Sequence, residues 1–316
     1  MQRRVLGHTG IQVAPLMFGG NVFGWTVDEA GSFRILDAFV DRGFDFIDTA
    51  DVYSRFAPGN KGGESETILG KWFKARGTRN KVVLATKVGN DMGDGKKGLS
   101  AKYIFEAVED SLRRLQTDHV DLYQSHRDDE TTPLEETLGA YQKLIEQGKV
   151  RAIGASNYTG ERLRVALAVG KEKGLAVYET LQPEYNLYAR QAYETDLEPV
   201  VREFGLGVIP YFALASGFLT GKYKTKEDVR GAKREALLGK YFDERGVRIL
   251  AALEEVAREA KATQAAVALA WLLARPSVTA PIASATSVEQ LESLFEAVEL
   301  KLSEAAIAKL TEASAY

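Results

Sequence analysis

The sequence predicts an α/β fold, a (β/α)8 TIM barrel, from three observations. Short apolar segments alternate with segments of helical periodicity through most of the chain, which predicts parallel strands joined by crossover helices. The chain has 316 residues, a length typical of one barrel domain. No Gly-x-Gly-x-x-Gly turn follows the first strand, where an open doubly wound sheet would hold a dinucleotide pyrophosphate. We therefore expect residues 1–316 to form a single barrel domain.

The elements are expected in a regular order along the chain. Residues 3–6 and 11–14 are short strand-like segments around a turn-rich interval, which predicts an N-terminal β-hairpin. Apolar runs predict the barrel strands at residues 16–18, 44–47, 82–85, 120–123, 150–154, 178–182, 207–211 and 278–281. The spacing of apolar residues predicts helices at residues 28–41, 65–74, 101–115, 134–146, 160–173, 196–203, 245–261 and 288–296.

Two segments depart from this alternation. Residues 216–240, after the seventh strand, are rich in Gly, Lys and Arg and are too long for an ordinary barrel loop, which predicts a mobile segment over a site. After residue 303, Ala306, Ile307 and Leu310 form an apolar face, which is typical of a C-terminal helix that packs on the domain.

The composition disfavours several classes of partner and site. The formal net charge is −3 at pH 7, so the chain offers no excess of positive charge to a nucleic-acid backbone or an anionic membrane surface. It has no cysteine, which excludes disulfides, thiolate nucleophiles and cysteine-based metal sites. No segment resembles a signal peptide or approaches the roughly 20 apolar residues that span a bilayer. We expect a cytoplasmic protein that acts on a small molecule.

Three titratable residues follow three successive predicted strands. Asp48, Lys87 and His126 stand at or just beyond the ends of these strands. In a barrel the C-terminal strand ends meet at one mouth, where the active sites of this fold lie. Tyr53 belongs to the loop that follows Asp48, and this loop can bring its phenol back over the same mouth.

Together these four side chains suit the reduction of a carbonyl group. A free tyrosine has a pKa of about 10, and a neighbouring ammonium group, here Lys87, would lower that pKa toward the working range. Asp48 would hold Lys87 in place and keep it protonated. A neutral His126 would donate a hydrogen bond to the carbonyl oxygen as negative charge develops there. This chemistry needs no metal ion, and we expect no metal site.

Taken singly, each of these residues also has a structural interpretation. An aspartate at a strand end can simply cap the next turn, a tyrosine is often a rim aromatic, and a lysine is usually a solvated charge. A lone histidine is more often structural than catalytic. The joint order of the four residues favours the catalytic interpretation. The remaining histidines, His8 and His119, lie away from the predicted mouth, and we assign them to structure or solvent.

Three local motifs surround the four residues. They are Phe46-Ile47-Asp48-Thr49-Ala50-Asp51-Val52-Tyr53, Ala85-Thr86-Lys87-Val88 and Asp121-Leu122-Tyr123-Gln124-Ser125-His126. In sequence and order they resemble the aldo-keto reductase superfamily, and the resemblance runs nearly from end to end of the chain. It implies hydride transfer between a nicotinamide dinucleotide and a carbonyl or alcohol. It also implies that Tyr53 is the general acid–base and that the other three residues tune it.

The resemblance further implies a dinucleotide site along the mouth. Ser156, Asn157 and Gln182 resemble the residues that bind the nicotinamide carboxamide, and Tyr211 resembles the aromatic ring that stacks on the nicotinamide. The run from Leu214 to Lys222 resembles the pyrophosphate loop, where backbone N–H groups and a lysine meet the phosphates. The other residues expected to contact the cofactor are Gly20, Asn21, Asp48, Phe212, Ala213, Ala215, Ser216, Gly217, Arg230, Ala283, Ser284, Thr286 and Gln290.

The adenine end departs from the family pattern. Residues 284–290 stand where many members carry a lysine or arginine against a 2′-phosphate, but here they offer hydroxyl groups and an amide near a helix N-terminus. Such groups can also bind an anion, and Lys222 or Arg230 would add positive charge. We predict a preference for NADP(H), with NAD(H) as the alternative. Phe212 and Ala213 also depart from the pattern, since relatives often have serine and proline there.

Two other functions fit parts of the sequence. A metal-dependent barrel hydrolase would share the fold, but it would need several ligands at the mouth, and of the three histidines only His126 is suitably placed. A binding protein that senses nicotinamide redox state with slow turnover, like the relatives that serve as accessory subunits of channels, would keep all four residues. For a reductase, Trp25 and Phe56 are expected to form apolar walls of the substrate pocket.

Overall fold

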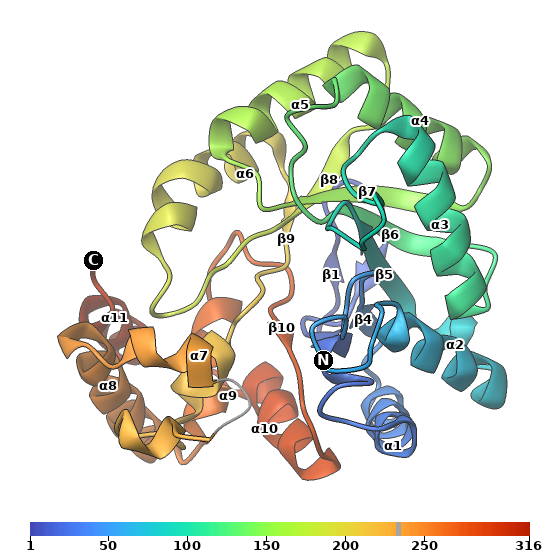
Figure 1. Cartoon of the computed structure of the whole chain (residues 1–316). Helices are drawn as coiled ribbons and strands as arrows, with labels where there is room; N and C mark the ends of the chain where they lie inside the picture. Colours follow the sequence, from blue (N-terminus) through green and yellow to red (C-terminus); the bar gives the residue numbers. More distant parts are fainter. Residues whose placement is uncertain (232–234) are drawn as a thin grey trace.

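The computed structural model describes residues 1–231 and 235–316, and it contains the predicted barrel (Figure 1). The eight parallel strands of the described chain are β3 (Met17–Gly19), β4 (Phe46–Asp48), β5 (Val83–Val88), β6 (Val120–Ser125), β7 (Val150–Ser156), β8 (Tyr178–Gln182), β9 (Gly207–Val208) and β10 (Ile282–Ala283). They pair in the order β10-β3-β4-β5-β6-β7-β8-β9. Val208 bridges to Val278, and the Ile282 N–H donates to the Pro210 carbonyl at 2.9 Å, which closes the sheet on itself. The predicted fold class is confirmed.

The predicted N-terminal hairpin closes one end of the barrel. Its strands β1 (Arg4–Val5) and β2 (Gln12–Val13) are antiparallel. Leu6, Ile11 and Val13 belong to the same buried apolar cluster as strand residues inside the barrel, such as Met17 and Phe46. The hairpin therefore plugs the end of the barrel opposite the C-terminal strand ends.

Helices form an outer layer around the strands (Figure 1). Those predicted from the sequence are α1 (Glu29–Asp41), α2 (Glu64–Arg76), α3 (Ala101–Leu115), α4 (Leu134–Glu146), α5 (Gly160–Lys173), α6 (Glu198–Phe204), α8 (Glu244–Ala260), α10 (Val288–Glu299) and α11 (Glu304–Ala313). Many begin at a residue whose side chain accepts a hydrogen bond from a free N–H of the first turn. Asp28 caps α1 in this way, and Ser100, Thr159 and Asp243 cap α3, α5 and α8. None of the described helices combines the length and the apolar character needed to cross a membrane.

Two elements differ from the prediction. Helix α9 (Gln264–Leu273) was not predicted, because its sequence is apolar on every side and has no helical periodicity; such a helix is buried all round. The last strand pairs at Ile282–Ala283 and not at residues 278–281. Pro281 lies in the predicted segment and has no N–H to donate to a ladder, and Val278 forms only an isolated bridge.

The long interval after the seventh barrel strand contains several short helical turns. They are η4 (Ala215–Thr220), η5 (Glu227–Val229), α7 (Glu235–Leu238) and η6 (Gly239–Tyr241); residues 232–234 of the predicted mobile segment lie outside the described residues. Phe218 and Tyr241 stack with ring centroids 5.2 Å apart, and Leu219 and Leu238 are fully buried. These contacts hold the described turns on the barrel, and mobility of the interval stays a prediction.

Gly70 marks a close approach between α2, which follows the Tyr53 loop, and α3. A Cβ atom on Gly70 would lie 2.1 Å from the Arg114 carbonyl oxygen, whereas Gly139 in α4 has no heavy atom within 4 Å of its Cβ position. We expect Gly70→Ala to lower the free energy of unfolding by about 1–3 kcal/mol, because the two backbones must separate. Gly139→Ala should raise it by about 0.5–1 kcal/mol through helix propensity. Denaturant unfolding of both variants tests this; equal effects would contradict it.

Candidate active site

Strand alternation directs polar side chains into the mouth of the barrel. Phe46, Ala85 and Leu122 lie in the apolar cluster inside the barrel. Successive side chains of a strand point to opposite faces, so the residues two positions further along also point inward. These residues are Asp48, Lys87 and Gln124. The apolar core of the barrel is therefore capped by a polar layer at the C-terminal strand ends.

Lys87 stands at the centre of this layer. Its Nζ lies 2.6 Å from Asp48 Oδ2, 2.7 Å from the Tyr53 hydroxyl and 2.9 Å from the Thr49 carbonyl oxygen. The Tyr53 hydroxyl also donates to Asp48 Oδ2 at 2.9 Å. Asp48 and Lys87 are both 0 % exposed. A buried ion pair is tolerated when its remaining hydrogen-bonding groups are satisfied, and here all three ammonium protons have an acceptor.

A second set of contacts fixes the other oxygen of Asp48. Gln182 Nε2 lies 3.2 Å and Gln124 Nε2 3.4 Å from Asp48 Oδ1, and the two glutamine side chains lie 3.3 Å apart. These amides orient the carboxylate so that Oδ2 faces Lys87 and Tyr53. Gln124 was not among the site residues predicted from the sequence. Its inward position, two residues after Leu122 on a strand, is the signal that would have found it.

The electrostatic environment of the tyrosine differs from the sequence-based expectation. Burial raises the pKa of Tyr53 well above its usual range, and the charge and hydrogen bond of Asp48 raise it further. Burial lowers the pKa of Lys87, and Asp48 opposes that change. The expectation that Lys87 lowers the pKa of Tyr53 is therefore wrong for the protein without ligands, because desolvation and the carboxylate outweigh the ammonium. The phenol therefore keeps its proton at neutral pH in the protein without ligands.

His126 follows β6 and lies beside the tyrosine. Its backbone N–H donates to the Val88 carbonyl at 2.8 Å, and its ring lies 5.9 Å from the Tyr53 ring, centroid to centroid, at 75°. Burial, followed by the charges of Lys87 and Arg127, lowers the pKa of His126 well below its ordinary value. The imidazole is therefore neutral, and its Nδ1 has no hydrogen-bond partner among the described residues. A neutral imidazole retains one N–H that can donate to a ligand.

Asp48, Tyr53, Lys87 and His126 form a tetrad. The residues expected around the nicotinamide form a chain of hydrogen bonds that reaches this tetrad. Tyr211 donates from its hydroxyl to Asn157 Oδ1 at 2.9 Å, and Asn157 Nδ2 donates to the His126 carbonyl at 2.8 Å and to Ser156 Oγ at 3.1 Å. Ser156 Oγ donates to the Gln182 carbonyl at 2.8 Å. The structure thus brings these predicted residues together with Asp48, through the side chain of Gln182.

The expected pyrophosphate loop has an unusual backbone. Within it, Ala215, Ser216 and Gly217 have φ values of 46°, 58° and 100°, and Phe212, two residues before the loop, has a φ of 51°. The left-handed region is costly for residues other than glycine and is found preferentially at ligand sites. Backbone turned in this way can direct N–H groups into a concave anion site. The Nζ of Lys222 lies 3.7 Å from the position of a Cβ atom on Gly217, so its ammonium group adjoins this loop. These features fit a bound pyrophosphate.

Other predicted cofactor residues line the neighbouring strand ends. Gly20 packs so closely on β4 that a Cβ atom would lie 2.9 Å from the Asp48 carbonyl oxygen. Ser284 Oγ lies 2.8 Å from Asn21 Oδ1, which joins the loops after β10 and β3. Ala283, in β10, is buried. Ala213, another predicted cofactor contact, is buried, and Leu214, the first residue of the predicted pyrophosphate loop, is partly buried.

The adenine end is less completely assembled. Thr286 donates from its backbone N–H to Gln290 Oε1 at 2.9 Å, at the start of α10. Thr286 also lines an open groove of about 550 Å³ together with Trp25, Asp28 and Arg34. Arg230 is exposed beyond η5, and within the described chain its side chain has no hydrogen bond or ion pair to the other predicted residues. No contact within the described residues joins Arg230 to the site, and its role stays a prediction.

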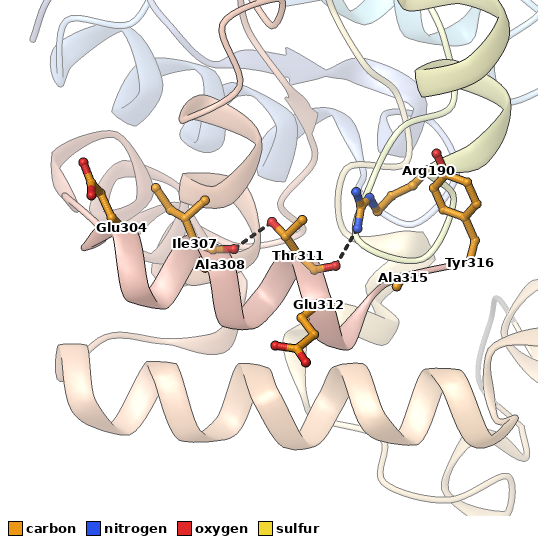
Figure 2. Close-up of a pocket in the computed structure, with 8 residues that line it drawn as sticks. All are labelled: Arg190, Glu304, Ile307, Ala308, Thr311, Glu312, Ala315 and Tyr316. Atoms are coloured by element: carbon orange, nitrogen blue, oxygen red, sulfur yellow. Dashed lines mark hydrogen bonds between the residues drawn. The ribbon is translucent and has the colours of Figure 1, made fainter.

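A second groove, of about 720 Å³, lies along α11 (Figure 2). In Figure 1, α11 packs beside α8, away from the strands that carry the tetrad. Figure 2 shows Arg190, which lies between β8 and α6, reaching to α11, where it donates to the Thr311 carbonyl at 2.7 Å. Arg190 also pairs with Glu194 at 2.8 Å. These internal contacts make the groove part of the packing of the C-terminal helix.

The comparison with known proteins agrees with this geometry. The model of the aldo/keto reductase family matches residues 15–315. The chain belongs to this family. Among the relatives of this aldo/keto reductase is the uncharacterized oxidoreductase YrpG of Bacillus subtilis (strain 168), which is 40% identical over 96% of this chain and 92% of its own length. The aldo-keto reductase YhdN of the same organism is 33% identical over 94% of this chain and 88% of its own length.

A relative with a different kind of name is equally well covered. A probable voltage-gated potassium channel subunit beta of Arabidopsis thaliana is 33% identical over 95% of this chain and 92% of its own length. The resemblance noted from the sequence is therefore confirmed at the level of the family. Membership, together with relatives named as oxidoreductases, makes this aldo/keto reductase an oxidoreductase.

Proposed function

We propose that this chain reduces aldehydes or ketones to alcohols with NADP(H), and that Tyr53 is the general acid. The observation that carries the proposal is the pair of contacts that Lys87 Nζ makes, 2.6 Å to Asp48 Oδ2 and 2.7 Å to the Tyr53 hydroxyl. A proton donor held against a buried cation can transfer its proton and leave a stabilised phenolate. Lys87 and Asp48 are held by the barrel strands β5 and β4, and Tyr53 lies on the loop that follows β4.

In the proposed reaction, proton transfer is the task of the protein. The bound dinucleotide would supply a hydride to the carbonyl carbon. As the C=O π electrons move to oxygen, Tyr53 gives its proton to that oxygen, and the O–H bond of the phenol breaks. Lys87 stabilises the phenolate that forms, and Asp48 keeps Lys87 charged. His126 donates a hydrogen bond to the carbonyl oxygen and orients the substrate.

The residues that would hold the cofactor are those of the hydrogen-bonded chain and the left-handed loop. Asn157 and Ser156 would bind the nicotinamide carboxamide with Gln182, whose Oε1 accepts none of the hydrogen bonds described above. Tyr211 would stack on the ring. Residues 214–217 and Lys222 would meet the pyrophosphate. The preference for NADP(H) rests on Lys222 and on the hydroxyl and amide groups of Thr286 and Gln290 at the start of α10.

The proposed substrate side rests on two aromatic residues that contact each other. Trp25 and Phe56 pack edge to face with ring centroids 4.8 Å apart, and Phe56 is 62% exposed although it is a large apolar side chain. Phe56 lies three residues after Tyr53 on the same loop. We propose that the pair forms an apolar wall that accepts aromatic or aliphatic carbonyl compounds.

A second candidate function is that of a redox-sensing accessory subunit with slow turnover. The relative named as a potassium channel subunit beta favours it, since that protein matches the chain over nearly its whole length. Sustained consumption of NADPH with a panel of carbonyl compounds distinguishes the two functions. A single slow hydride transfer without cycling would favour the sensor.

The metal-dependent hydrolase is tested separately. Activity that survives exhaustive chelation argues against it.

Replacement of the proposed acid should separate chemistry from binding. We expect Tyr53→Phe to lower kcat by about 10²–10⁴-fold, the usual contribution of a positioned acid, while the Kd of the dinucleotide changes little. Fluorescence titration and steady-state kinetics measure the two quantities. Tyr316→Phe makes the same chemical change in the groove along α11 and should leave both unchanged. Loss of dinucleotide binding in Tyr53→Phe would mean that Tyr53 has a different role.

The cofactor preference is tested by comparing the two dinucleotides with one carbonyl substrate. We expect the KM for NADPH to be at least about tenfold lower than the KM for NADH, because one additional charge-assisted hydrogen bond contributes about 1.5–3 kcal/mol. A lower KM for NADH would overturn the preference and leave the proposed reaction standing.

A further inference from the structure

A buried carboxyl group next to the tetrad is left without a partner. Asp51 follows Asp48 by three residues on the loop that leaves β4, and its side chain is 2% exposed. Neither of its carboxylate oxygens has a hydrogen-bond partner among the described residues. Its backbone N–H donates to the Lys87 carbonyl at 3.3 Å, which fixes Asp51 beside β5. An ionised carboxylate buried in this way would lack the compensation that such groups normally require.

Arg114, a cation whose charge acts on Asp51, is already engaged by another carboxylate. Arg114, from α3, donates to Glu66 at 2.7 Å, and Glu66 also accepts from Thr86 at 2.5 Å. Glu66 is fully buried on α2 and has Arg114 as its own counter-ion, and its charge acts on Asp51. Lys87 is shared in the same manner, since its ammonium bonds to Asp48. Asp51 therefore meets one like charge and two cations that are committed elsewhere.

The titration behaviour agrees with this arrangement. Burial and then the charge of Glu66 raise the pKa of Asp51 to about 8, against the opposing influence of Arg114, the Val52 backbone N–H and Lys87. The charge of Asp51 in turn raises the pKa of Lys87 and of three buried or half-buried tyrosines, Tyr103, Tyr123 and Tyr141. Asp51 and Lys87 thus each shift the pKa of the other.

We propose that Asp51 is a second proton-binding carboxyl group behind the site, neutral near neutral pH, which on ionising becomes an additional counter-charge that holds Lys87 protonated. It is a positioning residue, because it acts on Tyr53 only through Lys87. In alkaline solution its negative charge keeps the ammonium protonated to a higher pH than Asp48 alone would. Lys87 can then still stabilise the phenolate that forms when Tyr53 transfers its proton. This effect on catalysis rests on the proposed function, whereas the binding of the proton does not.

The first experiment measures proton binding without any assay of activity. Between the pKa of an unfolded aspartate, about 3.9, and that of folded Asp51, about 8, the folded protein carries a proton that the unfolded chain has released. The stability of the wild type must therefore fall with rising pH, relative to a variant that lacks this group. Asp51→Asn is that variant, because it is isosteric and never charged. Asp41→Asn is the matched control, since Asp41 is exposed at the end of α1.

We expect the Tm of Asp51→Asn to exceed that of the wild type by a margin that grows from pH 5 to pH 8 and then levels off, while Asp41→Asn shows no such trend. A Tm difference that does not change between pH 5 and pH 8 would overturn the proposal. So would a loss of stability in Asp51→Asn that increases above pH 5, because it would identify Asp51 as an ionised partner of a cation. A variant that does not fold would have the same meaning, since a neutral isostere should be tolerated.

The second experiment measures the pH dependence of kcat for carbonyl reduction in the wild type and in Asp51→Asn. We expect the alkaline decline of kcat to begin about one pH unit lower in the variant, the size of effect that a nearby charge has on a pKa. If kcat declines over the same alkaline pH range in the wild type and in Asp51→Asn, the positioning role is overturned. Proton binding by Asp51 is then decided by the Tm result alone. If the wild type reduces no carbonyl compound, the proposed function fails, and the Tm result still decides whether Asp51 binds the proton.

Discussion

The buried ion pair between Lys87 and Asp48 is the interaction on which the rest of the site depends. Removing two charges from water costs several kcal/mol per ion, and their attraction offsets this cost only when every remaining hydrogen-bonding group is satisfied. Here the Thr49 carbonyl and the Tyr53 hydroxyl complete the ammonium, and Gln124 and Gln182 complete the carboxylate. The ion pair lies on β4 and β5, and its partners come from the loop after β4, from β6 and from β8. The pair therefore exists only because the barrel brings these strands to one mouth.

The same arrangement explains why the acid lies where it does. Tyr53 is attached to the loop after β4, and its hydroxyl shares Oδ2 of Asp48 with Lys87, so its position is set by the ion pair. His126 is placed by the ends of β5 and β6. Burial and the charges of Lys87 and Arg127 keep it neutral. The groups proposed to bind the nicotinamide join this network through Gln182. Proton transfer, substrate orientation and cofactor binding therefore depend on one hydrogen-bonded layer.

Much of the fold and part of the site could be predicted from the sequence, for physical reasons that particular residues illustrate. Alternating apolar segments located the strands and most helices, and strand ends located Asp48, Lys87 and His126. Helix α9 was missed because a helix buried on all sides has no periodicity, and β10 was displaced because Pro281 cannot join a ladder. Gln124 was overlooked because its role depends on contacts between strands. The pKa of Tyr53 was misjudged because burial is a property of the folded chain and not of a motif.

A crystal structure of the protein with a bound nicotinamide dinucleotide tests most directly whether the Lys87–Asp48 pair organises the site. We predict that Lys87 Nζ stays within hydrogen-bonding distance of both Asp48 Oδ2 and the Tyr53 hydroxyl, with the nicotinamide ring against Tyr211 and beside that hydroxyl. A complex in which Lys87 and Tyr53 separate, or in which the nicotinamide lies away from this mouth, would contradict it.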